Sequence, residues 1–165
     1  MEFRPMIRKN KELPLETCLE LLRKEKRGVL SVLGDGGYPY GMPMDHYFND
    51  EDGKLYFHCG RIGHRLDALR VHDKVSYCCI DGGTPVPDDW ALQFRSVIAF
   101  GRIHVVDDEN EKQHAARLLG NRYNPSNDEA LLQELQRGLA RMLALRFDIE
   151  HLTGKQAIEL VKNTP

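Results

Sequence analysis

GVLSVLGDGGYPYGMPMDHYFNDEDGKLYFHC, residues 28–59, consists of three segments of β type separated by two turn signals. The first segment, residues 28–33, is apolar and β-branched, and the GDGG that follows favours a tight turn into the aromatic-rich residues 38–48. NDEDG is a second turn, and residues 54–59 alternate between two faces as a strand does. The stretch therefore predicts a three-stranded antiparallel meander.

Two prolines restrict the middle strand of this meander. Pro39 and Pro43 have no backbone N–H to give to a neighbouring strand. Residues 38–48 should therefore lie at a sheet edge, contain a bulge, or turn these nitrogens away from the ladder.

Further strand and helix patterns surround the meander. Strand patterns recur at residues 74–80, 94–106 and 143–149. Helical spacing or capping signals occur at residues 15–25, 64–73, 109–123 and 127–142. The strand at residues 94–106 is expected to be the longest, with Gly101 as a bulge or bend. Because the helices do not alternate with the strands, we predict a mainly β fold, an antiparallel barrel of six or more strands with peripheral helices, in one domain of residues 1–165.

The composition limits the function classes. The chain has 165 residues, and 23 Lys plus Arg against 25 Asp plus Glu give a formal charge of −2. This balance provides no general basic surface for nucleic acid and no polybasic tail for a membrane. No window approaches the ~18 apolar residues that span a bilayer, and the first residues lack the apolar centre of a secretory signal. With four cysteines and no C-x-x-C pair, we expect a cytoplasmic protein with reduced thiols.

Several catalytic motifs are absent from the sequence. It contains no G-x-x-x-x-G-K-[ST], no G-x-G-x-x-G after a strand, no H-E-x-x-H and no G-x-S-x-G. Nucleotide hydrolysis, a Rossmann dinucleotide site, zinc proteolysis and serine hydrolysis therefore have no support. His58 and His64 are six residues apart across a turn, with no Cys or carboxylate at tight ligand spacing beside them, so we expect no metal.

The segment HCGRIGHR, residues 58–65, is the most informative one. It leads from the end of a strand through two glycines to the start of a helix, where backbone N–H groups and the helix dipole favour phosphate. The side chains that would add charge and donors are those of His58, Arg61, His64 and Arg65. A mononucleotide or phosphorylated cofactor fits this segment. The alternative is that the glycines only form the turn and the arginines are solvated.

Residues 43–47, PMDHY, form a second candidate site on the strand expected to pair with the one that ends in His58. Alternation places Met44, His46 and Phe48 on one face, and Asp45 and Tyr47 on the other. A flavin ring can lie on such a strand edge, where backbone groups reach its hydrogen-bonding rim. The alternative is a partly buried aromatic face with Asp45 at its rim.

Arg95 begins the strand of residues 94–106. It is a candidate ligand contact or a buried partner for a carboxylate. A surface salt bridge is the alternative.

Three segments together resemble the nitroimidazole resistance (Nim) proteins, a branch of the pyridoxamine 5′-phosphate oxidase-like FMN-binding split-barrel proteins. They are LYFHCGRIGHRLDAL at residues 55–69, FRSVIAFGRI at residues 94–103 and EHLTGKQAIELV at residues 150–161, in the family's order and spacing. The similarity extends from about residue 4 to residue 161. It implies a split β-barrel that forms a homodimer, with two flavin sites at the interface to which both chains contribute.

The resemblance also implies roles for single residues. The isoalloxazine ring of FMN would be lined by Pro43, Met44, Asp45 and Tyr47. The ribityl phosphate end would be held, or the cofactor bordered, by His58 and by Arg61, Gly63, His64 and Arg65 of the turn. His58 matches a key active-site histidine of Nim proteins. Arg95 and Ser96 match an Arg-Ser pair expected at the interface near the cofactor. Arg65 stands where lysine is common and offers a phosphate two parallel donors. Asp45 and His46 stand where some members have small or neutral residues, and Asp45 leaves open both the redox potential and the substrate.

We therefore expect an FMN-dependent oxidoreductase, a reductase or oxidase, in which reduced flavin passes electrons or hydride to a small oxidised acceptor such as a nitroaromatic compound. His58 or His46 would act as proton donor, because an imidazole titrates near neutral pH. Two alternatives remain open: a non-catalytic flavin-binding or flavin-sensing protein, and a haem-binding split-barrel protein with His151 or another histidine as ligand. A genuine pyridoxamine 5′-phosphate oxidase is less favoured, because that enzyme's substrate-phosphate residues are not recognisable.

Overall fold

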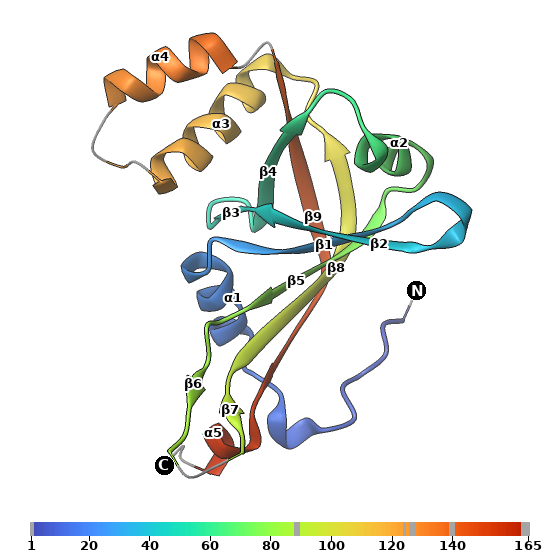
Figure 1. The fold of residues 1–165 in the computed structure, drawn as a ribbon, viewed down its shortest axis with the longest axis vertical. Helices are drawn as coiled ribbons and strands as arrows, with labels where there is room; N and C mark the ends of the chain where they lie inside the picture. Colours follow the sequence, from blue (N-terminus) through green and yellow to red (C-terminus); the bar gives the residue numbers. More distant parts are fainter. Residues whose placement is uncertain (1, 88–89, 124, 126–127, 139–140, 163–165) are drawn as a thin grey trace.

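The computed structural model describes residues 2–87, 90–123, 125, 128–138 and 141–162. Its centre is a seven-stranded antiparallel sheet, curled into half a barrel, with the strand order β2-β1-β5-β8-β9-β4-β3 (Figure 1). The strands are β1 (Arg27–Leu33), β2 (Pro39–Asp45), β3 (Tyr47–Asn49), β4 (Lys54–Gly60), β5 (Lys74–Ile80), β8 (Arg95–Val105) and β9 (Met142–Gln156). A separate pair, β6 (Thr84–Pro85) and β7 (Leu92–Gln93), extends from one end of the sheet (Figure 1). The predicted mainly β, antiparallel fold is confirmed.

The two edge strands of the sheet are consecutive in the chain. β2 pairs with β1 and β3 pairs with β4, and only His46 separates the end of β2 from the start of β3. One segment thus connects the first strand of the sheet to the last and curls the sheet towards closure. The predicted three-stranded meander is wrong, because the chain changes its hydrogen-bonding partner at His46. The edge position that Pro39 and Pro43 indicated is confirmed, and both prolines are exposed.

β8 and β9 form the longest pairing in the sheet. The strand predicted at residues 94–106 is confirmed as β8, but β9 has 15 residues against 11 in β8 and is the longer of the two. The pairing shifts register between Phe100 and Gly101, so the irregularity predicted at Gly101 is confirmed. A Cβ at Gly101 would collide with the carbonyl group of Asp148. Glycine therefore lets β9 approach β8 closely at this point.

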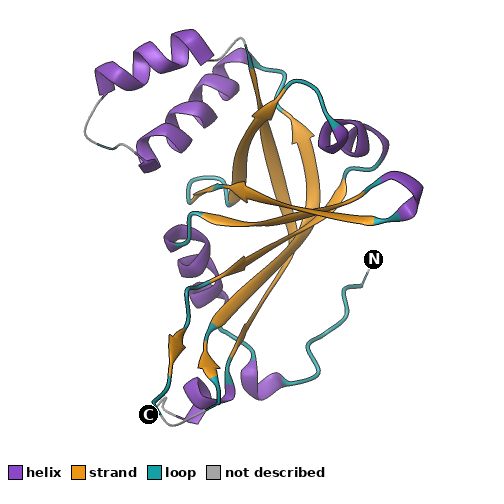
Figure 2. Cartoon of the chain, in the orientation of Figure 1, coloured by secondary structure: helices purple, strands orange, loops and turns teal. Residues whose placement is uncertain are grey.

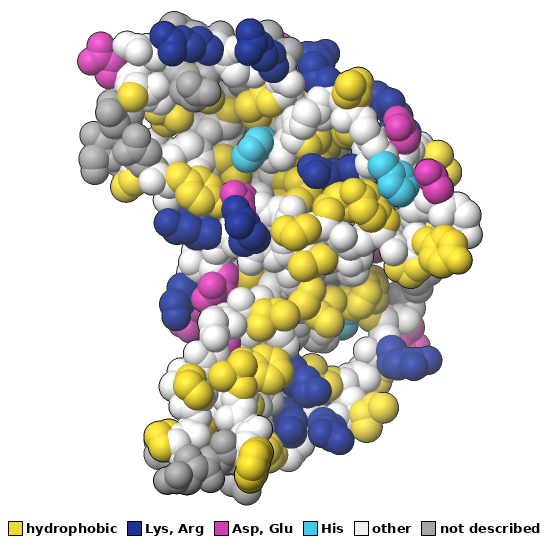
Figure 3. All heavy atoms as spheres, viewed as in Figure 1, with side chains coloured by type: hydrophobic (Ala, Val, Ile, Leu, Met, Phe, Trp, Pro, Cys, Tyr) yellow, Lys and Arg dark blue, Asp and Glu magenta, His cyan; other side chains and the backbone are white. Residues whose placement is uncertain are grey.

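The two faces of the sheet differ in their surroundings. The inner face of β1 and β5 is buried at every second residue, and α1 (Leu15–Lys24) packs Cys18, Leu21 and Leu22 into the same core. On the outer face, apolar side chains of β1, β5 and β8 are between 39% and 53% exposed: Val29, Leu33, Ile80, Ile98 and Phe100. Figure 3 shows hydrophobic side chains across the middle of one face of the molecule. The sheet therefore has an apolar outer face that the chain itself leaves open.

The helices lie around the sheet rather than between its strands (Figure 2). α2 (His64–Val71) follows β4 directly, α3 (Glu109–Tyr123) and α4 (Asp128–Gly138) form a hairpin beside one end of the sheet, and α5 (Ile158–Lys162) follows β9. The predicted peripheral helices are thus confirmed. Within the part of the chain that the structure describes, no helix combines the length and the apolar character needed to cross a lipid bilayer.

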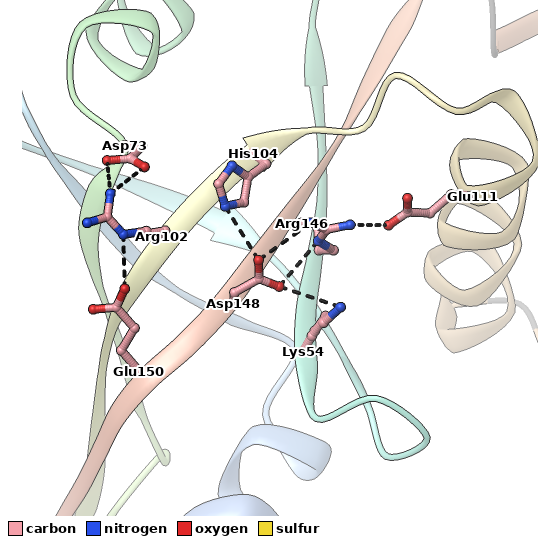
Figure 4. A network of polar contacts seen from close by, with 8 residues as sticks. All are labelled: Lys54, Asp73, Arg102, His104, Glu111, Arg146, Asp148 and Glu150. Atoms are coloured by element: carbon pink, nitrogen blue, oxygen red, sulfur yellow. Dashed lines mark hydrogen bonds and ion pairs between the residues drawn. The ribbon is translucent and has the colours of Figure 1, made fainter.

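A network of charged side chains on the outer face of β8 and β9 reaches α3 (Figure 4). Its members are Lys54, Asp73, Arg102, His104, Glu111, Arg146, Asp148 and Glu150. Arg146 lies at its α3 end, where Nη1 is 3.1 Å from Oε1 of Glu111. Near the other end of α3, Arg122 Nη2 donates to the carbonyl oxygens of Arg23 and Glu25. Both ends of α3 are therefore held against the rest of the fold.

Candidate functional site

The turn between β4 and α2 is formed by the segment predicted to bind phosphate. β4 ends at Gly60, and Gly63 precedes α2 with φ of 128°, a conformation that favours glycine. The N–H groups of Leu66 and Asp67 both donate to the carbonyl oxygen of Gly63, so the N–H groups of His64 and Arg65, the first two of α2, are the candidate donors at the turn. A Cβ placed at Gly60 or Gly63 would meet no atom within 4 Å. The turn therefore has open space above it, and it lines a hollow of about 180 Å³.

Two side chains of α2 connect this turn to β2. The imidazole of His64 stacks on the ring of Tyr40, with the ring centroids 4.4 Å apart and 9° between the planes. Arg65 Nε donates to Sδ of Met42 at 2.9 Å. Tyr40, His64 and Arg65 all line the hollow, so a cationic guanidinium and an imidazole stand beside the N-terminus of α2. These are groups that bind a phosphate through charge-assisted hydrogen bonds.

The alternation predicted for residues 44–48 is confirmed, but its apolar face is the core. Met44 and Phe48 are 5% exposed and His46 is fully buried. His46 Nε2 lies 2.8 Å from the carbonyl oxygen of Leu22, and Nδ1 lies 2.7 Å from the hydroxyl of Tyr77. Burial lowers the pKa of His46 to about 4. Because the protein occupies both ring nitrogens, we withdraw His46 as a proton donor, and we also withdraw the Met44 side chain as a contact to a flavin ring.

Asp45 lies on the opposite side of β2 and is paired with Arg27. The two residues face each other in the β1–β2 register, with Arg27 Nε 2.5 Å from Asp45 Oδ1. The Arg27 guanidinium lowers the pKa of Asp45, and Tyr123 of α3 and His58 of β4 also interact with the carboxylate. The structure thus brings Asp45 close to His58, although the two residues belong to separately predicted sites. Asp45 is a neutralised group rather than an isolated charge.

Three further predicted residues lie on the outside of the molecule. Pro43 and Arg61 are exposed, and Tyr47 is half-buried, opposite Tyr56 in the β3–β4 register. His58 is exposed as well, on the side of β4 opposite the core. These positions leave Pro43, Tyr47, His58 and Arg61 accessible to a ligand.

A cavity beside His58 was not predicted. It has a volume of about 340 Å³ and lies between β4, β9 and the α3–α4 hairpin. Its walls include Leu119, Tyr123, Leu131, Leu135 and Met142. Residues 127–142 were predicted to contain a helix, and α4 is found there, but no signal in the sequence related that helix to His58.

Arg95 and Ser96 lie at the far end of the sheet from the β4–α2 turn. Arg95 is opposite Gln156 on β9, whereas Gly60 is opposite Met142, at the other end of the same strand. The separation along β9 is roughly 45 Å, since a strand rises about 3.3 Å per residue. Arg95 lines a separate small hollow, and its buried Nε has no hydrogen-bond partner among the described residues. A single chain therefore does not bring Arg95 and His58 together.

Solved structures with this fold include proteins of several descriptions. A conserved protein of Mycobacterium tuberculosis has a TM-score of 0.81 at 16% identity, over 98% of this chain and 94% of its own. A candidate 5-nitroimidazole antibiotic resistance protein of Bacteroides thetaiotaomicron has a TM-score of 0.75 at 19% identity, over 88% and 86%. An FAD- and haem-binding protein of Mycobacterium smegmatis has a TM-score of 0.70 at 20% identity, over 89% and 73%. At these identities the likeness shows the fold alone.

The sequence itself determines the family. A comparison with curated proteins gives no significant match. The family model described as pyridoxamine 5′-phosphate oxidase, by contrast, matches residues 14–156. This range runs from the residue before α1 to the last residue of β9, so it includes every strand of the half-barrel and the β4–α2 turn. The chain belongs to the pyridoxamine 5′-phosphate oxidase family.

Proposed function

We propose that this protein binds FMN and that, with the flavin reduced, it passes electrons or hydride to a small oxidised acceptor such as a nitroaromatic compound. The observation that carries the proposal is the convergence of three elements. The β4–α2 turn has the residues for a phosphate site, and the edge strand β2 carries the exposed Pro43. His58 lies two residues before Gly60, which lines the hollow at the turn, and it interacts with the carboxylate of Asp45 on β2. Family membership and the resemblance to Nim proteins support the same assignment.

The phosphate end of the cofactor is assigned to the β4–α2 turn. Arg65 would give a charge-assisted hydrogen bond, and the N–H groups of the first turn of α2 would supply further donors. The Nε of Arg65 donates to the sulfur of Met42, which ties the guanidinium to β2. His64 is held by its stacking on Tyr40 and accepts a hydrogen bond at Nε2 from the Asp35 N–H, at 3.3 Å.

The ring end is assigned to the outer side of β2, near Pro43, Asp45, Tyr47 and His58. Bound flavin would supply the electron-transfer chemistry. Asp45 is neutralised by Arg27, so it adds little net charge near the ring. His58 is exposed and able to deliver a proton from a ring nitrogen to a reduced acceptor. The burial of His46 leaves His58 as the proton donor of this proposal.

The site is incomplete in one chain, and we propose that a homodimer completes it. The hollow of about 180 Å³ at the turn has room for a phosphate group but not for a whole flavin nucleotide. The outer face of β1, β5 and β8 carries the exposed side chains of Val29, Ile80 and Ile98. Contiguous exposed apolar surface of this kind is typical of a protein–protein interface. A second copy over this face would cover it and supply the missing wall.

Two alternatives share this fold. The FAD- and haem-binding protein of Mycobacterium smegmatis has it, so another flavin and haem are both alternatives to FMN. His151, the histidine first considered for haem, stacks on Phe3 with ring centroids 4.5 Å apart, on the outer face of the sheet. A flavin-binding protein without turnover would use the same residues as the enzyme. The cytoplasmic location stays a prediction from the sequence.

The test begins with the visible absorption spectrum of the purified protein, followed by mass determination of any chromophore released by heating. We expect the two bands of an oxidised flavin and release of FMN. A Soret band would show that the protein binds haem rather than flavin, and release of FAD would show that its flavin is FAD rather than FMN. A colourless protein that cannot be reconstituted with FMN would refute the proposal. If FMN binds, consumption of an acceptor by the photoreduced protein separates an oxidoreductase from a non-catalytic flavin-binding protein.

A further inference from the structure

The cavity between the α3–α4 hairpin and the sheet shares one described lining residue, His58, with the site proposed to hold the cofactor. None of its described lining residues belongs to the β4–α2 turn or to β2. His58 is the link, because it lies at the margin of the cavity while Gly60, two residues further along β4, lines the hollow at the turn. The cavity is therefore next to the proposed flavin site and meets it at His58.

The fold maintains this space through α3. Its two ends are held by the Arg146–Glu111 pair and by the bonds of Arg122 to backbone carbonyls. α4 packs against α3, and a Cβ at Gly120 would collide with the side chain of Leu131. The missing side chain at Gly120 thus sets how closely α4 approaches. The hairpin forms a wall at a fixed distance from β4 rather than collapsing onto it.

The chemistry of the lining favours an uncharged ligand. Leu119, Leu131, Leu135 and Met142 are apolar, and among the described lining residues His58 is the one with a basic side chain. Burying a charged ligand against such walls without a counter-ion would cost several kcal/mol. The Tyr123 hydroxyl donates to the carbonyl oxygen of Lys26 at 3.2 Å, so its hydrogen is already used. A neutral molecule with one polar group near His58 meets all of these conditions.

The size and the walls favour an aromatic ring. The volume of about 340 Å³ falls within the range of small-molecule sites. An apolar cavity of about 150 Å³ is enough to hold benzene. Met142 places a thioether, and Tyr123 a ring, on the wall, and both make favourable contacts with aromatic groups. The space therefore suits one substituted ring or two small ones.

We propose that this cavity binds an uncharged aromatic molecule, with the ring between α3 and α4 and one polar substituent directed at His58. The role of the cavity as the site of the electron acceptor rests on the flavin function proposed above. Binding of the aromatic molecule to the cavity does not depend on that function. The position of His58, between the cavity and the turn, lets one imidazole contact the substituent and face the flavin site. This geometry selects neutral acceptors over anionic ones.

The test compares two probes that differ in charge, 4-nitroanisole and 4-nitrobenzoate, by ligand-observed NMR on the protein as purified and after saturation with FMN. We expect 4-nitroanisole to bind in both states, and 4-nitrobenzoate to bind at least about tenfold more weakly, the factor that corresponds to 1.4 kcal/mol. Equal affinity for the two probes would overturn the selection by charge.

Three variants locate the site. Ala116→Leu fills the cavity from α3, where Ala116 is 5% exposed and lines it. Leu131→Gln makes one wall polar, and Glu129→Gln introduces the same side chain at an exposed position of α4 as the matched control. We expect Ala116→Leu and Leu131→Gln to bind 4-nitroanisole about tenfold more weakly, the effect of losing roughly one buried apolar side chain. The control Glu129→Gln should bind it with wild-type affinity. Ala116→Leu should remain folded, because it adds apolar volume to an existing space.

The result can separate this inference from the flavin function. Binding of 4-nitroanisole that is lost in Ala116→Leu supports the cavity site even if FMN does not bind. FMN binding with no 4-nitroanisole binding, or with equal binding by all three variants, refutes the cavity site and leaves the flavin function standing.

Discussion

Replacing Arg65 with Ala tests the phosphate assignment directly. The guanidinium lines the hollow at the β4–α2 turn and is half-buried there, with Nε 2.9 Å from the sulfur of Met42. A charge-assisted hydrogen bond to a phosphate contributes roughly 1–3 kcal/mol, and partial exposure favours the lower part of that range. We therefore expect Arg65→Ala to weaken FMN binding by about 5- to 30-fold. The fold should change little, because a thioether is only a weak hydrogen-bond acceptor.

The assay is a titration with FMN, followed by quenching of flavin fluorescence. Arg70→Ala is the matched control, since Arg70 is on the same helix, is 65% exposed and pairs with Asp67. Arg65→Lys keeps the positive charge but loses the paired N–H donors of the guanidinium, so its affinity for FMN should lie between those of the wild type and Arg65→Ala. Unchanged affinity in a folded Arg65→Ala variant, or an equal loss in Arg70→Ala, would refute the assignment of the phosphate to this turn.

Three further predictions concern other parts of the molecule. His58→Ala should keep the fold and bind FMN, yet reduce acceptor turnover by about 10²-fold or more if His58 is the proton donor; a wild-type rate in the FMN-loaded variant would remove that role. Neutral His46 has a pKa of about 4 in the fold, below the 6.5 of an unperturbed histidine. Its contribution to the free energy of unfolding is therefore complete above pH 6.5 and is lost as the pH falls towards 4. Denaturant unfolding should show that the free energy of unfolding falls by roughly 3 kcal/mol between pH 6.5 and pH 4, and that this fall is absent in a folded His46→Gln variant. The same dependence on pH in both proteins would contradict this prediction. Gly101→Ala should lower the free energy of unfolding by about 1–3 kcal/mol, because its Cβ would collide with Asp148, and a thermal midpoint within one degree of the wild type would show that β9 can shift without cost.

The sequence was sufficient to predict the elements that local chemistry determines. GDGG places a turn between residues 33 and 38, Pro39 and Pro43 restrict their strand to an edge, and Gly101 marks the irregular pairing of the long strands. The ion pair of Arg27 with Asp45 was also within reach, because the turn fixes the register that places the two residues opposite each other. The family resemblance rested on similar local segments and identified the superfamily correctly.

The features that the sequence did not determine all depend on contacts between distant segments. Alternation placed Met44 and His46 on one face, but it could not show that this face is the core, because that depends on α1 supplying Leu22 as a partner for His46. The single strand predicted at residues 38–48 failed for the same reason: its first half pairs with β1 and its last residues with β4. The cavity beside His58 depends on how α3 and α4 pack, and no local sequence pattern encodes the distance between this hairpin and the sheet.

The position of Arg95 yields a last prediction. Because Arg95 and the β4–α2 turn occupy opposite ends of β9, Arg95 reaches a flavin site only if that site belongs to a second chain packed in the opposite direction on the exposed face of β1, β5 and β8. Arg65→Ala and Arg95→Ala chains, copurified with two different tags as a mixed dimer, test this arrangement. If each site takes Arg65 from one chain and Arg95 from the other, one site of the mixed dimer carries both substitutions and the other carries neither. Half of the wild-type FMN capacity should then remain at wild-type affinity, although each variant alone binds FMN more weakly. If both residues of a site came from the same chain, each site of the mixed dimer would carry one substitution, and no site would keep wild-type affinity. If Arg95 took no part, the Arg95→Ala variant alone would bind FMN with wild-type affinity.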